Sequence, residues 1–151
     1  MAPVPIEDSI KEELSEILSQ AMIVGDKRKH LAVILTLKTV LDKNNQPTDQ
    51  LHPDVVKWLE SLGCNALTPK EVIADENDNV KEALMKAMNK VNKKAISKAQ
   101  KVHKFMIAPT DFSLAGGELT PTLKLKRFFI TEKYAKEIER MFEYETQSSM
   151  W

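Results

Sequence analysis

The sequence predicts an α+β fold, and three observations lead to this prediction. Apolar patterns succeed one another as a helix, two strands, several helices, a third strand, a fourth extended segment and a closing helix. The 151 residues suffice for one compact domain with a real hydrophobic core. No internal repeat or low-complexity tract interrupts them. We therefore expect one domain with mixed secondary structure.

The N-terminal part is predicted to form a helix and then a hairpin. Pro5 suits a first helical turn, and the apolar residues after it recur at helical spacing: Ile6, Ile10, Leu14 and Ile17. The apolar runs Ala21–Val24 and Leu31–Leu37 lie close together in sequence, which favours an antiparallel hairpin, and their continuous apolarity predicts burial on both faces. The polar residues Asp42–Asp49 show no periodicity and are predicted to form a loop.

The middle of the chain is predicted to be helical. Pro53–Leu62 has one apolar side, and Gly63 suits a C-terminal cap. Thr68–Ala74 begins with a capping box and has proline at the first helical position. Asp78 can cap a longer helix over Asn79–Ala95. Its predicted buried stripe is Val80, Leu84, Ala87, Met88, Val91 and Ala95.

The C-terminal part is predicted to contain a strand and a closing helix. Phe105–Ala108 has the pattern of a strand, which Pro109 ends. Thr131 is predicted to cap the closing helix. The apolar face of that helix comprises Tyr134, Ile138, Met141 and Phe142. The polar residues 143–151 are expected to form a frayed, flexible tail.

Composition excludes several classes of protein. The 22 basic and 22 acidic residues balance, so the chain as a whole is not a polyanion binder. Cys64 is the only cysteine, which excludes an internal disulfide and fits a reducing compartment such as the cytoplasm. Glu7 and Asp8 interrupt any N-terminal signal pattern. No apolar run approaches the roughly 20 residues of a membrane-spanning helix. We expect a soluble chain.

The residues 116–127 form the most informative segment, Gly-Gly-Glu-Leu-Thr-Pro-Thr-Leu-Lys-Leu-Lys-Arg. Gly116 and Gly117 allow a sharp turn, and from Leu119 onward apolar and polar residues alternate with period two. An extended segment would therefore expose Lys124 on one face with its polar neighbours Thr120, Thr122 and Lys126. A lysine beside hydroxyl groups and a glycine turn suits the binding of a phosphate or carboxylate. A purely solvated strand face would show the same pattern.

This segment resembles the final core motif of long-chain acyl-CoA synthetases, in the adenylate-forming superfamily, and especially the bubblegum-type branch. Other matching segments follow in the family's order: Ala2–Glu7, Met22–Lys29, Leu35–Lys38, Asn92–Ser97 and Asp111–Ser113. The resemblance implies that residues 1–142 form the family's C-terminal lid domain, a small mixed sheet with flanking helices. It also implies that residues 42–74 are an insertion characteristic of the bubblegum branch.

The same resemblance implies a function. Such ligases join a fatty acid to ATP with Mg²⁺ and then transfer the acyl group from AMP to coenzyme A. Lys124 matches the lysine that enters the active site during adenylation, and Lys126 and Arg127 follow as neighbour and anchor. Leu123 stands where the superfamily commonly has glycine. The family's ATP and fatty-acid sites lie mainly in an N-terminal domain, and this sequence has no glycine-rich phosphate loop. The chain alone is therefore expected to be inactive.

A lysine stripe forms a second candidate site. Five lysines recur at helical spacing opposite the apolar stripe: Lys86, Lys90, Lys93, Lys94 and Lys98. They could be a solvated helix face, or could attract the phosphates of coenzyme A or an anionic membrane surface. Attraction to an anionic membrane surface would allow peripheral attachment to the endoplasmic reticulum or another intracellular membrane. Nucleic acid is not expected as a partner, because aromatic residues form no interleaved stacking pattern.

Other chemistry is weakly represented. His30, His52 and His103 lack the spacing of a metal site, and Cys64 is expected to be a small core thiol. Three interpretations therefore remain open. The chain is the lid of a synthetase, a non-enzymatic interaction module with the same fold, or a binder of membranes or polyanions through its basic helix. An intact Lys124 motif favours the first interpretation over the second.

Overall fold

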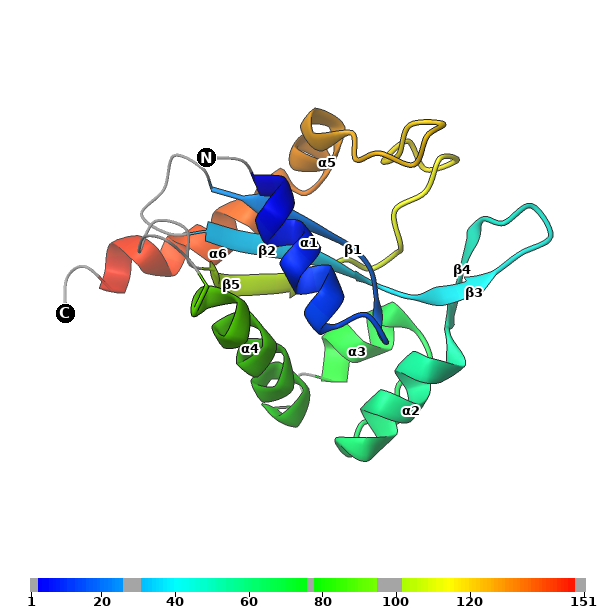
Figure 1. The fold of residues 1–151 in the computed structure, drawn as a ribbon, viewed down its shortest axis with the longest axis horizontal. Coiled ribbons are helices and arrows are strands. Elements are labelled where there is room, and N and C mark those ends of the chain that lie inside the picture. The colour runs from blue at the N-terminus through cyan, green and yellow to red at the C-terminus, as the bar shows by residue number, and fades with distance from the viewer. Residues whose placement is uncertain (1–2, 26–30, 76–77, 95–101, 149–151) are drawn as a thin grey trace.

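The computed structural model of the chain describes residues 3–25, 31–75, 78–94 and 102–148 and confirms the α+β fold (Figure 1). In chain order its helices and strands are α1 (Pro3–Glu13), β1 (Leu18–Val24), β2 (Leu31–Leu37), β3 (Thr39–Leu41), β4 (Pro47–Leu51), α2 (Pro53–Ser61), α3 (Pro69–Asp75), α4 (Asp78–Asn92), β5 (Val102–Ile107), α5 (Arg127–Lys133) and α6 (Ala135–Ser148).

A mixed three-stranded sheet with the order β1-β2-β5 forms the centre of the domain. β1 and β2 pair antiparallel, with Met22 opposite Ile34, as the sequence predicts. β5 pairs parallel to β2, with Phe105 opposite Val33. Every residue of β2 is buried, because helices cover both faces of the sheet. This burial explains the unbroken apolar run of Leu31–Leu37.

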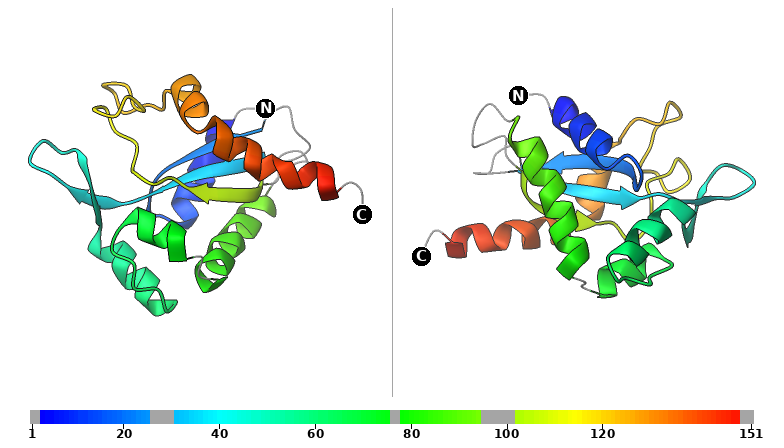
Figure 2. Two further views of the ribbon diagram at one scale, coloured as in Figure 1. Left: turned by 180° about the vertical axis from the view of Figure 1, so that it is seen from behind. Right: turned by 60° about the horizontal axis from the view of Figure 1, so that its bottom comes forward.

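Two hydrophobic cores lie on opposite faces of β2 (Figure 2). Leu31, Val33 and Leu35 contribute to the first core, together with residues of α1, α2 and α4. Ala32 and Ile34 contribute to the second core, together with residues of α5 and α6. Strand side chains alternate between the two faces, so β2 joins both cores. The face that carries α5 and α6 is therefore distinct from the face that carries α4.

The predicted helices of the middle segment are confirmed, and their ends show local capping. Gly63 has φ 82°, and its amide donates to the carbonyl of Glu60 at 3.0 Å. Thr68 Oγ1 accepts a hydrogen bond from the amide of Glu71 at 3.2 Å at the start of α3. His52 Nδ1 accepts from the amide of Asp54 at 3.1 Å and caps α2. The role of His52 as a cap was absent from the sequence prediction.

The prediction of a polar loop over residues 42–49 is only partly correct, because residues 42–46 form a turn but residues 47–49 lie in a strand. This strand, β4, pairs with β3 and forms a projecting hairpin (Figure 1). Thr48 Oγ1 donates to the carbonyl of Val40 at 2.6 Å, while the Asp42 carboxylate accepts from the amides of Asn44 and Gln46 and closes the turn. Most of this hairpin is exposed or half-buried, so it carries no apolar alternation to signal its strands.

The closing helix also differs from its prediction. Helix α5 already begins at Arg127, and Thr131 lies inside it, where its hydroxyl donates to the carbonyl of Arg127 at 2.7 Å instead of capping a new helix. Helix α6 continues to Ser148, so residues 143–148 are helical where a frayed tail is expected. Residues 149–151 lie outside the described residues. Within the part of the chain that the structure describes, no helix is long and apolar enough to cross a membrane.

Candidate functional site

The loop between β5 and α5 contains the candidate site (Figure 1). The extended strand predicted from Leu119 onward is absent there. The amide of Leu123 donates to the carbonyl of Thr120 at 2.8 Å, so the chain reverses in a β-turn with Pro121 at its second position. Leu119 and Leu125 form an isolated antiparallel bridge below this turn. The alternation therefore belongs to a tight hairpin, and Pro121 was the sequence signal that could have revealed it.

Lys124 follows directly after the turn and is exposed. Its amide donates to Thr120 Oγ1 at 3.1 Å, and its carbonyl accepts from the amide of Thr120 at 2.9 Å. Thr122 Oγ1 lies 3.1 Å from Thr120 Oγ1. No described residue forms an ion pair with the Lys124 ammonium. Thr120 therefore fixes the backbone of Lys124, and the cationic side chain of Lys124 stays available to an anion.

Leu123 departs from its prediction most clearly. The alternating pattern predicts that it is buried, but its side chain is 63% exposed and its φ is 63°. A left-handed backbone is uncommon for a residue with a branched side chain and costs about 1–2 kcal/mol. Closure of the turn imposes this conformation on Leu123. Leu123 therefore places an apolar side chain on the surface beside Lys124.

The glycine pair closes a second turn before the hairpin, as predicted. Gly117 has φ 88°, and its amide donates to the carbonyl of Leu114 at 3.1 Å. Gly116 is required for a different reason. Its amide donates to Ser113 Oγ at 2.8 Å. A Cβ atom at this position would clash with Glu118 Oε1. Both positions therefore favour glycine.

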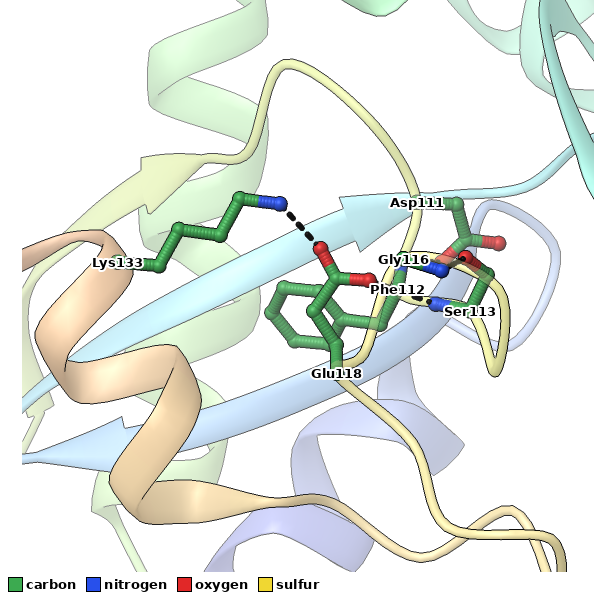
Figure 3. A network of polar contacts seen from close by, with 6 residues as sticks. All are labelled: Asp111, Phe112, Ser113, Gly116, Glu118 and Lys133. Carbon is green, nitrogen blue, oxygen red and sulfur yellow. Dashed lines mark hydrogen bonds and ion pairs between the residues drawn. The ribbon is translucent and has the colours of Figure 1, made fainter.

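Glu118 anchors this turn from inside, and the sequence analysis assigned it no role. The residue is 1% exposed, and its Oε1 accepts from the amide of Ser113 at 3.1 Å. Its other carboxylate oxygen pairs with the Lys133 ammonium on α5 (Figure 3). That hydrogen bond is the main reason why the pKa of Lys133 is raised. A buried carboxylate needs such partners, so Glu118 fixes the glycine turn against α5.

Arg127 anchors the other end of the loop. Its two terminal nitrogens donate to the two carboxylate oxygens of Glu7, each at 2.6 Å. Glu7 is 4% exposed, and its Oε2 also accepts from the amide of Ile23 at 2.7 Å. The bidentate bond raises the pKa of Arg127. Arg127 is thus an anchor, as predicted, but it joins α5 to α1 and β1 and does not hold a strand.

Asp111 lies buried at the start of the loop, where its Oδ1 accepts from the amide of Phe112 at 2.8 Å. Burial raises the pKa of its carboxyl group, and the nearby charge of Glu118 acts in the same direction. Hydrogen bonds from the side chains of Ser19 and Thr36 lower the pKa and only partly offset the burial. The Asp-Phe-Ser segment is therefore a structural support for the glycine turn.

This raised pKa predicts a pH-dependent effect of Asp111→Asn. The folded protein binds the Asp111 proton more tightly than the unfolded chain, so this carboxyl group stabilises the fold at low pH, and its contribution is lost as pH rises through the folded pKa. The stability of the variant relative to the parent chain should therefore rise as the pH increases above about 4, the ordinary pKa of an aspartate. Urea unfolding at several pH values measures this, with the exposed Asp49→Asn as control. A stability difference between Asp111→Asn and the parent chain that does not change with pH would contradict this prediction.

The glycine turn gives a second prediction. Gly117→Ala combines a strained backbone with a Cβ only 3.1 Å from the Phe129 ring, whereas Gly63→Ala has a similar φ of 82° and no atom within 4 Å. We expect Gly117→Ala to lower the free energy of unfolding by about 2 kcal/mol and Gly63→Ala by about 1 kcal/mol. Urea denaturation compares the two variants. Equal losses would mean that Phe129 does not restrict the turn.

Apolar side chains are exposed around the candidate site. Besides Leu123, Phe128 at the start of α5 is 78% exposed, and its neighbour Phe129 is 43% exposed. Leu114, before the glycine pair, is 45% exposed. Exposed large apolar side chains are available for contact with another surface. The loop therefore offers both a cation and an apolar contact surface.

The structure does not bring the lysine stripe together with Lys124. Lys86, Lys93 and Lys94 are exposed on or just after α4, which packs on the opposite face of the sheet from α5. The ammonium of Lys90 lies 3.2 Å from Glu13 Oε1 of α1. Lys98 lies outside the described residues. Lys90 therefore links α4 to α1 through an ion pair, and the lysine stripe forms a surface separate from the Lys124 loop.

Cys64 is buried, as predicted, and burial is the main cause of its raised pKa. Among the residues that the structure describes, no group of three or more His, Cys, Asp or Glu side chains could hold a metal ion.

Comparison with known proteins agrees with this fold. Residues 1–66 match the AMP-binding enzyme C-terminal domain. This part of the chain is similar to these C-terminal domains. The long-chain-fatty-acid–CoA ligase ACSBG2 of Gallus gallus is 40% identical over 99% of this chain, and ACSBG1 of Mus musculus is 39% identical over 96%. The resemblance to bubblegum-type ligases is therefore confirmed. The chain spans only 21% and 20% of these two relatives.

Solved structures show the same fold at low sequence identity. The adenylation domain of a carboxylate reductase from Mycobacterium chelonae is 16% identical, with a TM-score of 0.65 over 95% of this chain and 18% of its own length. The A-PCP didomain of a carboxylic acid reductase from Segniliparus rugosus, solved with AMP, has the same identity and TM-score over 97% of this chain and 16% of its own length. The chain therefore shares its fold with part of each of these two structures.

Proposed function

We propose that this chain is the C-terminal catalytic lid of a long-chain fatty acid–CoA ligase. Such a ligase activates a fatty acid with ATP through acyl-AMP and then passes the acyl group to coenzyme A. Two named ligases are similar to nearly the whole chain, yet the chain spans only about a fifth of each. This proportion supports a domain that works with a larger N-terminal adenylation domain. Residues 42–74, which form the turn after β3, β4, α2 and most of α3, stay a proposed insertion of the bubblegum branch.

The exposed position of Lys124 is the observation that carries this proposal. The turn holds its backbone through Thr120, while no described residue forms an ion pair with its ammonium. In the adenylation pose this ammonium would contact both the fatty-acid carboxylate and the α-phosphate of ATP. One cation between two anions offsets their repulsion as they approach, which lowers the barrier to their reaction. Because the turn fixes Lys124 beforehand, little reorganisation is needed when the substrates bind.

The neighbouring surface supports docking of the lid onto a larger domain. Leu123 and Phe128 would be covered when the lid closes, and their burial would contribute free energy to closure. Closure by hinge motion also removes water from the site. The anchors Glu118–Lys133 and Arg127–Glu7 keep the loop and α5 together with the rest of the domain. The loop can therefore move with the lid as one body.

Cofactor binding is divided between this chain and the proposed N-terminal domain. Lys124 is suited to an anionic group, which fits one contact to the phosphate of ATP. The described residues include no acidic cluster suited to Mg²⁺, and the whole sequence has only 4 glycines and no phosphate-binding loop. We therefore assign adenosine, Mg²⁺ and the fatty-acid chain to the N-terminal domain.

The lysine stripe supports a second contact, with the phosphates of coenzyme A. It lies on the face opposite the Lys124 loop, which suits a lid that presents different faces in the two half-reactions. The double variant Lys86→Glu, Lys93→Glu should then raise KM for coenzyme A and leave adenylation unchanged. An unchanged KM would leave the stripe as a solvated face or a contact to anionic membranes. We propose that the full-length ligase is cytoplasmic and attaches peripherally to the endoplasmic reticulum or another intracellular membrane.

An exchange experiment tests the proposed function. ACSBG2 of Gallus gallus, with its matching region replaced by this chain, should form palmitoyl-CoA from palmitate, ATP and coenzyme A. The same ligase with that region deleted should not, and neither should this chain by itself. An exchanged ligase as inactive as the deleted one would count against a lid. ATP-dependent thioester formation by the purified chain alone would overturn the division into two domains.

A further inference from the structure

An apolar groove of about 580 Å³ follows the outer edge of β5. The consecutive residues Phe105, Met106 and Ile107 form its floor, and residues of α3 and α4 and of α6 form its two walls. Helix α6 lies on the other side of β5 from α3 and α4 (Figure 2). Phe105 and Ile107 pack against the first core and Met106 against the second, so the groove opens between the two layers of helices. Of its lining residues, Pro109 alone belongs to the loop that carries Lys124, and it lies at the start of that loop, far in sequence from Lys124.

The backbone of β5 determines what kind of molecule suits this groove. The amide of Ala108 donates to the carbonyl of Leu35 at 2.9 Å, in continuation of the parallel pairing of β5 with β2. Backbone groups alternate in direction along a strand, so those of Phe105 and Ile107 point away from β2 toward the groove. No described residue accepts a hydrogen bond from these two amides. An occupant must therefore supply hydrogen bonds as well as apolar contact.

The charges at the rim determine the second property of the occupant. Lys70 on α3 and Lys81 on α4 are exposed on one wall, and Arg140 is exposed on the wall formed by α6. Glu137, also on α6, is the one carboxylate among the lining residues. Three cations and one carboxylate give a basic rim around an apolar floor. This rim favours an occupant that carries negative charge.

We propose that this groove binds an extended acidic peptide segment of another protein, which adds a strand to the outer edge of β5. Such a strand would bond to the backbone of Phe105 and Ile107, place its apolar side chains against the groove and direct its carboxylates to the lysines and the arginine. An alkyl chain would cover these backbone groups without a hydrogen bond, which is costly. A second copy of the chain would place one basic rim against another. The inference is independent of the proposed ligase function.

Selection from a library of short random peptides displayed on phage tests this proposal. The 151-residue chain is the target. The variant Lys81→Glu, Arg140→Glu serves for counter-selection. The enriched peptides should be acidic and should bind the variant about tenfold or more weakly than the parent chain. Hydrogen exchange at the amides of Phe105 and Ile107 should slow when a peptide is bound. Methylation of alternate backbone nitrogens of the peptide should abolish binding.

A matched control separates a local effect from a loss of overall charge. Lys86→Glu, Lys93→Glu changes the net charge equally but lies outside the groove, so it should bind the peptides as the parent chain does. Equal weakening by both double variants would overturn the proposal. It would also be overturned if no peptide were enriched, if exchange at Phe105 and Ile107 stayed fast in the complex, or if sodium decanoate bound the groove while peptides did not.

Discussion

Lys124→Ala is expected to slow the adenylation half-reaction by about two to three orders of magnitude in the exchanged Gallus gallus ligase. The substitution removes the one cation that the turn presents to the fatty-acid carboxylate and the α-phosphate. Thr120 Oγ1 bonds to the backbone amide of residue 124, so the turn itself should survive the loss of the side chain. Pyrophosphate release in a single turnover measures the effect, and thermal unfolding verifies that the domain is folded.

Lys126→Ala is the control for this variant. Lys126 is exposed two residues further on, and its amide bonds to the carbonyl of Glu118, which the substitution retains. The loss of a charge at this position should slow adenylation only slightly, since Lys126 follows the hairpin instead of closing its turn. Equal effects of the two substitutions would show that the general positive charge of the loop matters, and not the placement of Lys124.

Arg127→Met is expected to lower the free energy of unfolding by about 2–4 kcal/mol, because it leaves the buried Glu7 carboxylate without its bidentate partner. We expect a loss near the lower end of this range, because the Arg127 side chain is 38% exposed and water therefore screens part of its attraction to Glu7. The amide of Ile23 would remain the one hydrogen-bond donor shown for Glu7. Urea unfolding of the 151-residue chain measures the loss.

Two further variants make this prediction specific. Lys126→Met removes a neighbouring exposed cation and should change stability by less than about 0.5 kcal/mol. The double variant Glu7→Gln, Arg127→Met removes both charges and should be more stable than Arg127→Met alone, because no carboxylate is left buried without a partner. A double variant that is less stable than Arg127→Met would show that the unpaired charge is not the cause.

Periodicity predicted the layers of the fold well. The apolar run Leu31–Leu37 correctly indicated a strand buried on both faces, and the stripe of α4 correctly indicated its core-facing side. These segments are governed by burial of apolar surface, which leaves a regular pattern in the sequence. The β3–β4 hairpin was missed because little of it is buried, so its strands carry no such pattern.

The candidate site shows where sequence reasoning stops. Lys124 and the glycine pair were found from their residue types, but alternation wrongly predicted a strand, because a β-turn at Pro121 also fits the same residues. Glu118 was missed as an anchor, since its partners Ser113 and Lys133 become neighbours only when the loop folds against α5. Long-range contacts of this kind leave no spacing signal in a single sequence.

The rate of the second half-reaction in Lys124→Ala tests the central claim most directly. The measurement starts from synthetic palmitoyl-adenylate and coenzyme A, and it uses the exchanged ligase with and without the substitution. A lid that uses Lys124 only in the adenylation pose should form palmitoyl-CoA at close to the unsubstituted rate, although adenylation is slowed by about two to three orders of magnitude. Equal slowing of both half-reactions would contradict the proposed role of Lys124 and of the lid motion.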